Sequence, residues 1–309
     1  MSLELLNPTY MTIGLLLLGL VVWGLWYLLF RTPLGQGTLF DLTRPGKLLE
    51  MPFGQVHYID EGKGPCIVFL HGIGASVFTW RKILPELKHN YRVVALDLPG
   101  FGYSDKRVDL DYGLEAQSQR VLEIMDQLKI KQAFCVGSSM GGLIGLWLAH
   151  QYPERITSVL GISPPLNHRL VPFRLGWTQL LAGWSSRRMN SSLMRKILQR
   201  VLKTYGELED ADVEAYLRPY QGDTQAIRIF IKALHTIQDA RLPKVIKNHS
   251  FPILLLHGRF DRIVPLKVSQ KAVKRLASAQ LEVLPGSGHH PQEDEPQLVI
   301  KAIREFFSR

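Results

Sequence analysis

A serine lies between glycines in the stretch Gly137-Ser138-Ser139-Met140-Gly141, which follows a short apolar run and precedes a segment of helical character. This G-x-S-x-G pattern predicts a sharp turn from a strand into a helix, with Ser139 at its tip. Glycines are expected on both sides because the turn leaves no room for Cβ atoms. Backbone N–H groups at a helix N-terminus can hold a developing negative charge. Ser139 is therefore the candidate nucleophile, although an ordinary strand-to-helix turn would also fit the motif taken alone.

A serine hydroxyl needs a base that accepts its proton and a third group that orients this base. Asp261 lies in the loop after an apolar run typical of a buried strand. His289 follows a glycine-containing turn after the next such run. We predict that Asp261 orients His289 and that His289 is the base. His290 is the only near competitor for the base. Asp97 and Asp105 lie in other loops; we expect Asp97 to be structural in its Asp-x-Pro-Gly turn, which leaves Asp105 as the competing acid near the pocket.

A glycine-rich loop earlier in the chain is the candidate for stabilising an oxyanion. The apolar run Cys66–Leu70 predicts a strand, and His71-Gly72-Ile73-Gly74 follows it. A loop of this type after the third strand can supply one backbone donor, and the residue after the nucleophile supplies the other. We predict an oxyanion hole formed by the N–H groups of Ile73 and Met140. The alternative is a glycine-rich turn that contains a structural histidine.

The order of these residues along the chain, Ser139 then Asp261 then His289, resembles that of the α/β-hydrolase superfamily. The resemblance covers most of residues 50–309 and is to the lipase and esterase branch that carries a helical cap. Its further matching segments are 69–72, 97–104, 258–265 and 288–296. It implies a mostly parallel central sheet flanked by helices, a cap insertion and hydrolysis of esters. Epoxide hydrolases and haloalkane dehalogenases of this superfamily have an aspartate where Ser139 stands, which argues against both activities.

An uncharged apolar segment occupies residues 11–30. Twenty helical residues span about 30 Å, which is the hydrocarbon thickness of a bilayer. We expect an uncleaved transmembrane helix rather than a signal peptide, because no Lys or Arg precedes the segment and it ends in bulky residues. Arg31, Arg44 and Lys47 follow the span. This positive charge predicts a single-pass membrane protein with a cytoplasmic catalytic domain.

Helical periodicity appears between the two halves of the sheet pattern. Apolar residues recur at helical spacing over 193–202 and again over 222–240, which predicts a helical cap. Residues 166–205 contain eight Lys or Arg and no Asp or Glu. Such a segment is either a solvated basic face or a surface that lies against anionic lipid headgroups. No nucleic-acid recognition motif accompanies the charge, so nucleic acid is not an expected partner.

Composition is consistent with one large folded domain. The chain of 309 residues has a formal net charge of +10 and is 46% hydrophobic, which is enough for a core. Cys66 and Cys135 lie in predicted strands and are expected to be buried thiols. No C-x-x-C pair, His-rich cluster or G-x-G-x-x-G motif predicts a metal or a cofactor. We divide the chain into an N-terminal segment with the anchor (1–31), a linker (32–50), the first part of the core (51–164), the cap (165–245) and the second part of the core (246–309).

The expected function is hydrolysis of a lipidic carboxylic ester through an acyl-enzyme on Ser139. A single span followed by this domain is similar to membrane-anchored monoacylglycerol lipases, and this likeness implies a monoacylglycerol or lysophospholipid substrate. Membrane lipid is then an expected partner through the N-terminal helix and the basic cap. Thioesterase, C–C bond hydrolase and cofactor-free peroxidase activities use the same three residues and remain alternatives. A non-enzymatic membrane accessory protein is a further alternative, but it would have no physical need for all of these segments.

Overall fold

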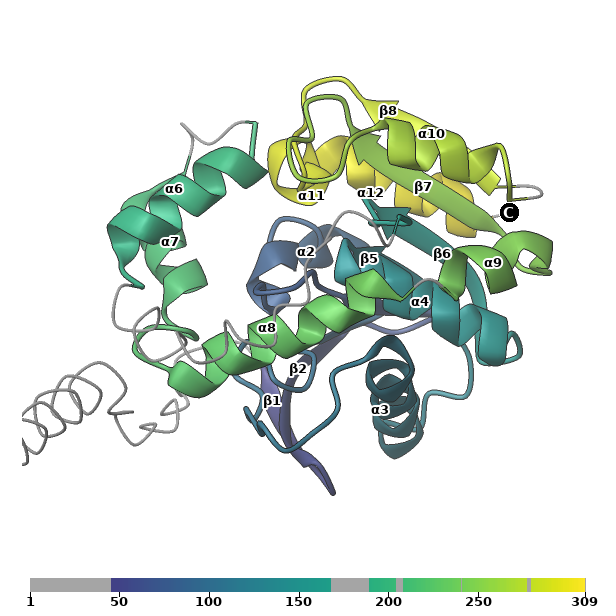
Figure 1. Cartoon of the computed structure of the whole chain (residues 1–309). Helices are drawn as coiled ribbons and strands as arrows, with labels where there is room; N and C mark the ends of the chain where they lie inside the picture. Colours follow the sequence, from purple (N-terminus) through teal and green to yellow (C-terminus); the bar gives the residue numbers. More distant parts are fainter. Residues whose placement is uncertain (1–45, 168–188, 204–207, 240, 277–278, 309) are drawn as a thin grey trace, which may run out of the picture.

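The computed structural model describes residues 46–167, 189–203, 208–239, 241–276 and 279–308. In this part of the chain eight strands form one sheet in the order β1-β2-β4-β3-β5-β6-β7-β8 (Figure 1). Strands β3 to β8 are parallel to one another, while β2 pairs antiparallel with both β1 and β4. The strands are β1 (Lys47–Met51), β2 (Gly54–Glu61), β3 (Cys66–Leu70), β4 (Arg92–Leu96), β5 (Ala133–Ser138), β6 (Ile156–Ile162), β7 (Ile253–Gly258) and β8 (Ala279–Leu284).

Helices cover both faces of the sheet, which explains why the inner strands are apolar throughout rather than alternating. A parallel strand that is covered on two sides must bury every side chain, and β7 is buried along its whole length. One face packs against α3 (Leu114–Gln127), α4 (Met140–Gln151) and α10 (Lys267–Val273). The other packs against η1 (Val77–Trp80), α2 (Leu84–Leu87) and α12 (Pro296–Phe307).

The predicted site residues lie at one end of this sheet. Parallel strands present their carboxyl ends at the same edge, and the loops beyond those ends are where sites form in open α/β sheets. Strand β3 leads into the loop of Ile73, β5 into Ser139, β7 into the loop of Asp261 and β8 into the loop of His289. The fold therefore brings together four segments that are far apart in the sequence.

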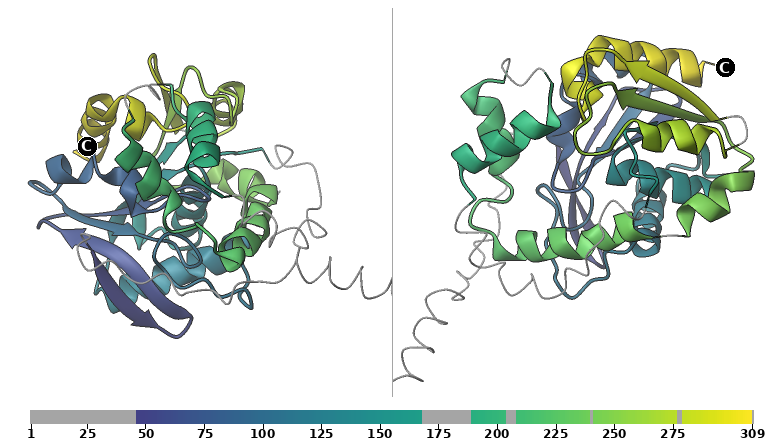
Figure 2. Two further views of the ribbon diagram at one scale, coloured as in Figure 1. Left: turned by 90° about the vertical axis from the view of Figure 1, so that its left-hand side faces the viewer. Right: turned by 45° about the horizontal axis from the view of Figure 1, so that its top comes forward.

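Among the described residues between β6 and β7, three helices lie over this end of the sheet. We refer to α6 (Ser191–Val201), α7 (Asp210–Leu217) and α8 (Thr224–Gln238) as the inserted helices. The predicted helical periodicities over 193–202 and 222–240 correspond to α6 and α8. Helices α6 and α7 share a small apolar cluster of their own, and α8 packs against α3 and α4 (Figures 1 and 2). The chain then passes through α9 (Leu242–Val245) and η5 (Ile246–Asn248) into β7.

A buried polar cluster joins the inserted helices to the core. Glu293, on the short helix α11 (Pro291–Asp294), accepts hydrogen bonds from the Tyr216 hydroxyl on α7 and from the Arg81 guanidinium beside η1. Arg81 also pairs with Asp212 of α7 at 2.9 Å. The Glu293 side chain is 1% exposed, so it depends on these partners to offset the cost of burial. Helix α7 is therefore held against α11 by charged hydrogen bonds, while its apolar contacts are with α6 and Phe78.

The prediction of a single-pass membrane protein must be corrected. Within the residues that the structure describes, no helix is both long enough and apolar enough to cross a bilayer. The longest of these helices, α8, has 15 residues, whereas a span needs about 20. The segment on which the prediction rested, 11–30, lies outside the described residues, as does much of the basic stretch 166–205. Arg195 of that stretch pairs with Asp210 of α7.

Candidate active site

The turn that carries Ser139 has the geometry that the glycine pattern predicts. Ser139 is the N-cap residue of α4, with φ 50° and ψ −115°, which is a left-handed backbone conformation that non-glycine residues rarely adopt. A Cβ at Gly141 would lie 2.1 Å from the Leu70 oxygen, and one at Gly137 would lie 2.4 Å from the Gly141 oxygen. Both glycines are therefore needed, and the strain is stored where the nucleophile is expected.

The structure brings His289 and Asp261 together as a hydrogen-bonded pair. His289 Nδ1 lies 2.8 Å from Asp261 Oδ2, and both side chains are at least 95% buried. Because an ionised carboxylate only accepts, Nδ1 carries the hydrogen, which leaves Nε2 of neutral His289 free to accept a proton. The loop of residues 261–264 closes on the same carboxylate, since the N–H groups of Ile263 and Val264 each donate to Oδ1 at 2.8 Å.

A second histidine completes the surroundings of Asp261. His257 Nε2 lies 2.9 Å from the Val264 carbonyl oxygen, which can only accept, and 3.3 Å from Asp261 Oδ2. Its Nε2 therefore carries a hydrogen that faces both oxygens. Burial alone would raise the pKa of Asp261, but hydrogen bonds from His257 and His289 outweigh it and hold the pKa well below its ordinary value. The carboxylate is consequently ionised at neutral pH.

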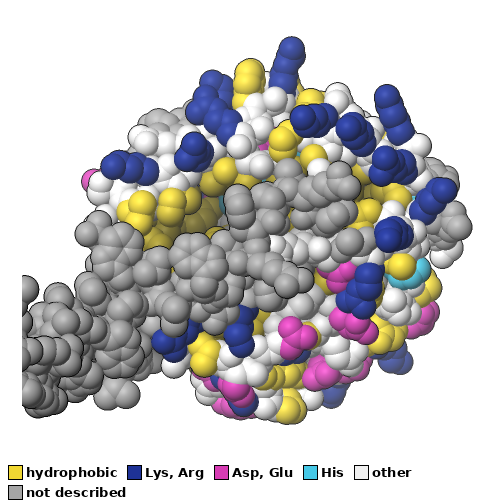
Figure 3. All heavy atoms as spheres, in the orientation of Figure 1, with side chains coloured by type: hydrophobic (Ala, Val, Ile, Leu, Met, Phe, Trp, Pro, Cys, Tyr) yellow, Lys and Arg dark blue, Asp and Glu magenta, His cyan; other side chains and the backbone are white. Residues whose placement is uncertain are grey.

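Ser139 and His289 line one cavity of about 710 Å³, roofed by the inserted helices. Ile73 lines the same cavity, whereas Met140 is fully buried as the first residue of α4. Among the described lining residues none is Lys, Arg, Asp or Glu, and most are aliphatic. They include Ile197, Leu198, Ile227, Ile231, Leu234 and Ile263. Figure 3 shows hydrophobic side chains gathered around a hollow on one face of the molecule.

His71 fixes the loop that contains Ile73. The N–H of Leu98 donates to His71 Nε2 at 3.0 Å, so the hydrogen of this neutral ring must be on Nδ1, which lies 2.7 Å from the Gly72 oxygen. Burial lowers the pKa of His71 and keeps it neutral. The N–H of Ala75 donates to the same Gly72 oxygen at 3.1 Å. These two hydrogen bonds fix the direction of the Gly72 carbonyl. In a trans peptide the N–H points opposite to the carbonyl, so the direction of the Ile73 N–H is fixed as well.

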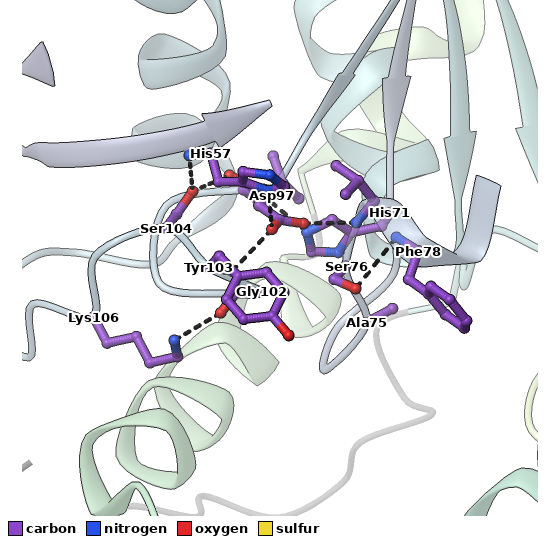
Figure 4. Close-up of polar contacts among 12 residues, drawn as sticks. His57, His71, Ala75, Ser76, Phe78, Asp97, Gly102, Tyr103, Ser104 and Lys106 are labelled. Atoms are coloured by element: carbon purple, nitrogen blue, oxygen red, sulfur yellow. Dashed lines mark hydrogen bonds and ion pairs between the residues drawn. The ribbon is translucent and has the colours of Figure 1, made fainter. Parts of the chain in front are cut away.

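The loop of residues 97–104 lies next to His71 and is held by Asp97, which is fully buried (Figure 4). Its carboxylate accepts from the backbone N–H groups of Val77 and Tyr103, at 2.6 and 2.8 Å, and lies 2.8 Å from His57 Nδ1. None of these residues is among the described residues that line the cavity. The structural role predicted for Asp97 therefore agrees with its surroundings, and Asp261 is the acid that contacts His289.

The sheet order, the strained serine turn and the His–Asp pair together point to one family. A sequence profile described as alpha/beta hydrolase fold matches residues 65–296. The chain belongs to the α/β-hydrolase family. The expectation drawn from the sequence motifs is thus confirmed for the family and for the mostly parallel sheet.

Relatives of this α/β hydrolase differ in the reactions that their names state. The chain is 30% identical over 257 residues to the uncharacterized hydrolase YugF of Bacillus subtilis, covering 81% of this chain and 92% of that protein. It is 29% identical to a 2-hydroxymuconate semialdehyde hydrolase of a Pseudomonas species, covering 81% and 89%. It is also 29% identical to the pimeloyl-[acyl-carrier protein] methyl ester esterase of Aeromonas hydrophila, covering 79% and 96%.

Solved structures agree on the fold. A meta-cleavage product hydrolase superposes with a TM-score of 0.71 at 26% identity, covering 85% of this chain and 98% of that one. The enol-lactonase of Burkholderia xenovorans superposes with a TM-score of 0.72 at 23% identity, covering 85% and 100%. At this identity the second comparison supports the architecture alone.

Sequence reasoning missed the contacts by which the inserted helices of this hydrolase reach the site. The His289 N–H donates to the Val201 carbonyl at the end of α6, at 2.7 Å. The Tyr220 hydroxyl bonds the Ala75 oxygen of the glycine-rich loop and accepts from the Gly102 N–H at 3.0 Å. Tyr216 belongs to α7 and Tyr220 to the turn that follows it, so the four-residue spacing of the two tyrosines was the available signal.

His290 gives this hydrolase a pH-dependent stability that can be measured. Burial and the nearby His289 lower the pKa of His290 to about 3 from its ordinary value of 6.5. Between these values the unfolded chain binds more protons than the folded one, so stability decreases as the pH falls below about 6.5. Replacing His290 with glutamine should reduce this slope by up to about 1.4 kcal/mol per pH unit. Urea unfolding from pH 7 to pH 5 tests this, and equal slopes for the two proteins would contradict it.

Proposed function

We propose that this protein is a serine hydrolase that cleaves an uncharged carboxylic ester with an apolar acyl group, through an acyl-enzyme on Ser139. The observation that carries the proposal is the single cavity that contains Ser139 and His289, with His289 hydrogen-bonded to a buried Asp261. We assign Ser139 as nucleophile, His289 as base and Asp261 as the residue that fixes the His289 tautomer. Residues 165–245 form the cap in this proposal, over a core of 51–164 and 246–309.

In the first half of the reaction His289 Nε2 takes the proton from Ser139 Oγ as this oxygen attacks the acyl carbon. The carbonyl π electrons move to the oxygen, which becomes an oxyanion that accepts from the N–H groups of Ile73 and Met140. When the carbonyl re-forms, the bond to the alkoxide breaks and His289 gives it the proton. An alcohol leaves and the acyl group stays on Ser139.

In the second half water replaces the alcohol. His289 takes a proton from the water, and the resulting hydroxide attacks the acyl carbon. The second oxyanion is held by the same N–H groups, and its collapse breaks the bond to Ser139, which regains the proton from His289. A carboxylic acid is released, so the sum is ester plus water giving acid plus alcohol.

The cavity supports an apolar substrate. Its volume of about 710 Å³ is in the range of small-molecule sites, and its described lining offers aliphatic side chains rather than charges. Burying one methylene is worth about 0.8 kcal/mol, or roughly fourfold in an equilibrium constant. An acyl chain that extends along these side chains would therefore gain binding energy with each added carbon until the cavity is full.

A second candidate is hydrolysis of a C–C bond, which the names of two relatives favour. These are the 2-hydroxymuconate semialdehyde hydrolase and, at 28% identity, a 2-hydroxy-6-oxo-2,4-heptadienoate hydrolase of Pseudomonas putida. Both names denote substrates with several oxygen groups, one of which is a carboxylate. The described cavity lining of this chain offers no Lys or Arg to pair with a carboxylate, which is why we place the ester first.

A chain-length series separates these candidates. We expect kcat/KM for 4-nitrophenyl esters to rise from acetate to octanoate, by roughly two- to fourfold per added methylene over the first steps. The same protein should cleave 2-hydroxy-6-oxo-2,4-heptadienoate at less than a hundredth of the best ester rate. Faster cleavage of the dienoate than of every ester would establish the second candidate. A flat ester series would contradict an apolar acyl site.

A further inference from the structure

The residue after the proposed base is a second histidine whose ring also faces the cavity. His290 lines the cavity and is 9% exposed. Its ring lies against that of His289, with centroids 5.3 Å apart and an interplanar angle of 28°. None of the catalytic steps described above uses His290. The presence of a polar ring in this mainly aliphatic cavity is therefore not explained by those steps.

One nitrogen of this ring is buried and, within the described part of the chain, has no hydrogen-bond partner. His290 Nδ1 has no hydrogen-bond partner among the residues that the structure describes, and it is shielded from solvent. A buried N–H without an acceptor is rarer in proteins than an acceptor without a donor. The less costly tautomer therefore leaves Nδ1 bare and places the hydrogen on Nε2. His290 then presents a donor at Nε2, the nitrogen that remains for a molecule in the cavity.

We propose that His290 is a substrate-binding residue that donates its Nε2–H to an oxygen of the substrate other than the scissile carbonyl. The inference rests on the proposed function, because that function places the scissile carbonyl oxygen at the N–H groups of Ile73 and Met140. It narrows the substrate class to apolar esters that carry one more acceptor, such as an ether, hydroxyl or keto oxygen. Because the two histidine rings are adjacent, this oxygen lies within a few bonds of the attacked carbon.

Electrostatics is consistent with a neutral donor at this position. A charged imidazolium beside His289 would oppose the protonation of His289 that each half-reaction requires. Burial and His289 lower the pKa of His290 to about 3, so the ring stays neutral while His289 takes up its proton. A phenylalanine could form the same ring contact without burying two nitrogens, so packing alone does not explain the residue.

Matched ester pairs test the inference. Each pair consists of an alkyl ester and its analogue with one methylene replaced by an ether oxygen, placed at successive positions of the acyl or alcohol chain. We expect the wild type to prefer one oxygen-bearing member by about five- to tenfold in kcat/KM, the effect of one hydrogen bond. His290→Phe should remove the preference, and His290→Gln, which keeps a donor near the same place, should restore part of it. Because kcat/KM is compared between the two esters of one pair, a change in the overall activity of a variant cancels from the ratio.

Controls keep this result separate from the proposed function. His150→Phe, a like change at the end of α4 and outside the described cavity lining, should keep the wild-type ratio. An unchanged preference in folded His290→Phe, or no preference in any wild-type pair, would overturn the role of His290. Absence of ester hydrolysis by the wild type would overturn the proposed function and this inference with it. Thermal unfolding of each variant shows whether it is folded.

Discussion

Replacing Ser139 with alanine is expected to lower kcat by about 10⁴- to 10⁶-fold while leaving the protein folded. Without Oγ no acyl-enzyme can form, and the remaining N–H groups can only stabilise slow attack by water. The measurement is hydrolysis of the best 4-nitrophenyl ester, together with labelling by a fluorophosphonate that reacts with activated serines. The wild type should be labelled and Ser139→Ala should not.

Ser138 provides the matched control for this experiment. It is the adjacent serine, fully buried, and its hydroxyl lies 3.4 Å from Gln292 Nε2, which also donates to Thr79 at 3.0 Å. Ser138→Ala should therefore stay within about tenfold of wild-type activity, since one weak hydrogen bond is lost. Full turnover by folded Ser139→Ala would refute the assignment of the nucleophile. An unlabelled wild type would favour a non-enzymatic protein on this fold.

Replacing Asp261 with asparagine is expected to lower kcat/KM by about 10⁴-fold with little change in shape. The carboxylate faces the N–H groups of Ile263 and Val264 and the rings of His257 and His289. An amide offers one oxygen to these donors and turns its own N–H₂ toward the rest. His289 then accepts at Nδ1 and carries its hydrogen on Nε2, where it cannot act as a base.

Asp105 is the control for this change, since it was the competing acid in the sequence. It is exposed, and its carboxylate accepts from the Gln55 N–H at 2.8 Å, on the far strand β2. Asp105→Asn should remain within about threefold of wild-type activity. If Asp105→Asn lost more activity than Asp261→Asn, the identity of the acid would have to be revised. Circular dichroism and thermal unfolding of both variants exclude a loss of fold as the cause.

Local motifs were sufficient to predict the positions of the proposed site residues. The apolar runs predicted strands close to β3, β5, β7 and β8, and each motif residue follows the expected strand. The glycines around Ser139 predicted a turn with no room for Cβ, as the Gly137 and Gly141 contacts show. Such signals are local, because a tight turn constrains residues that are neighbours in the chain. The catalytic and oxyanion roles themselves stay predictions until the variants are measured.

Contacts between distant segments could not be predicted in this way. Glu293 reads as one acidic residue in a charged segment, yet it is buried against Arg81 and Tyr216. Asp261 could be predicted from its place in the loop after a strand. The contact of its carboxylate with His257 could not, because that contact depends on the path of residues 261–264. Composition and periodicity describe single elements, and these pairs depend on how elements are placed in space. The prediction of a membrane protein was wrong for the described residues, none of which forms a helix that could cross a bilayer.

The hydrogen bond from the His289 N–H to the Val201 carbonyl has a consequence for the order of events in a catalytic cycle. The roof of the cavity and the backbone of the proposed base are one connected unit, because α6 ends at the residue that holds His289. A motion that lifted this end of α6 to admit substrate would release the His289 backbone at the same time. Opening by that route would therefore remove one backbone contact of the proposed base before a molecule enters, while the hydrogen bond to Asp261 would still hold the His289 ring.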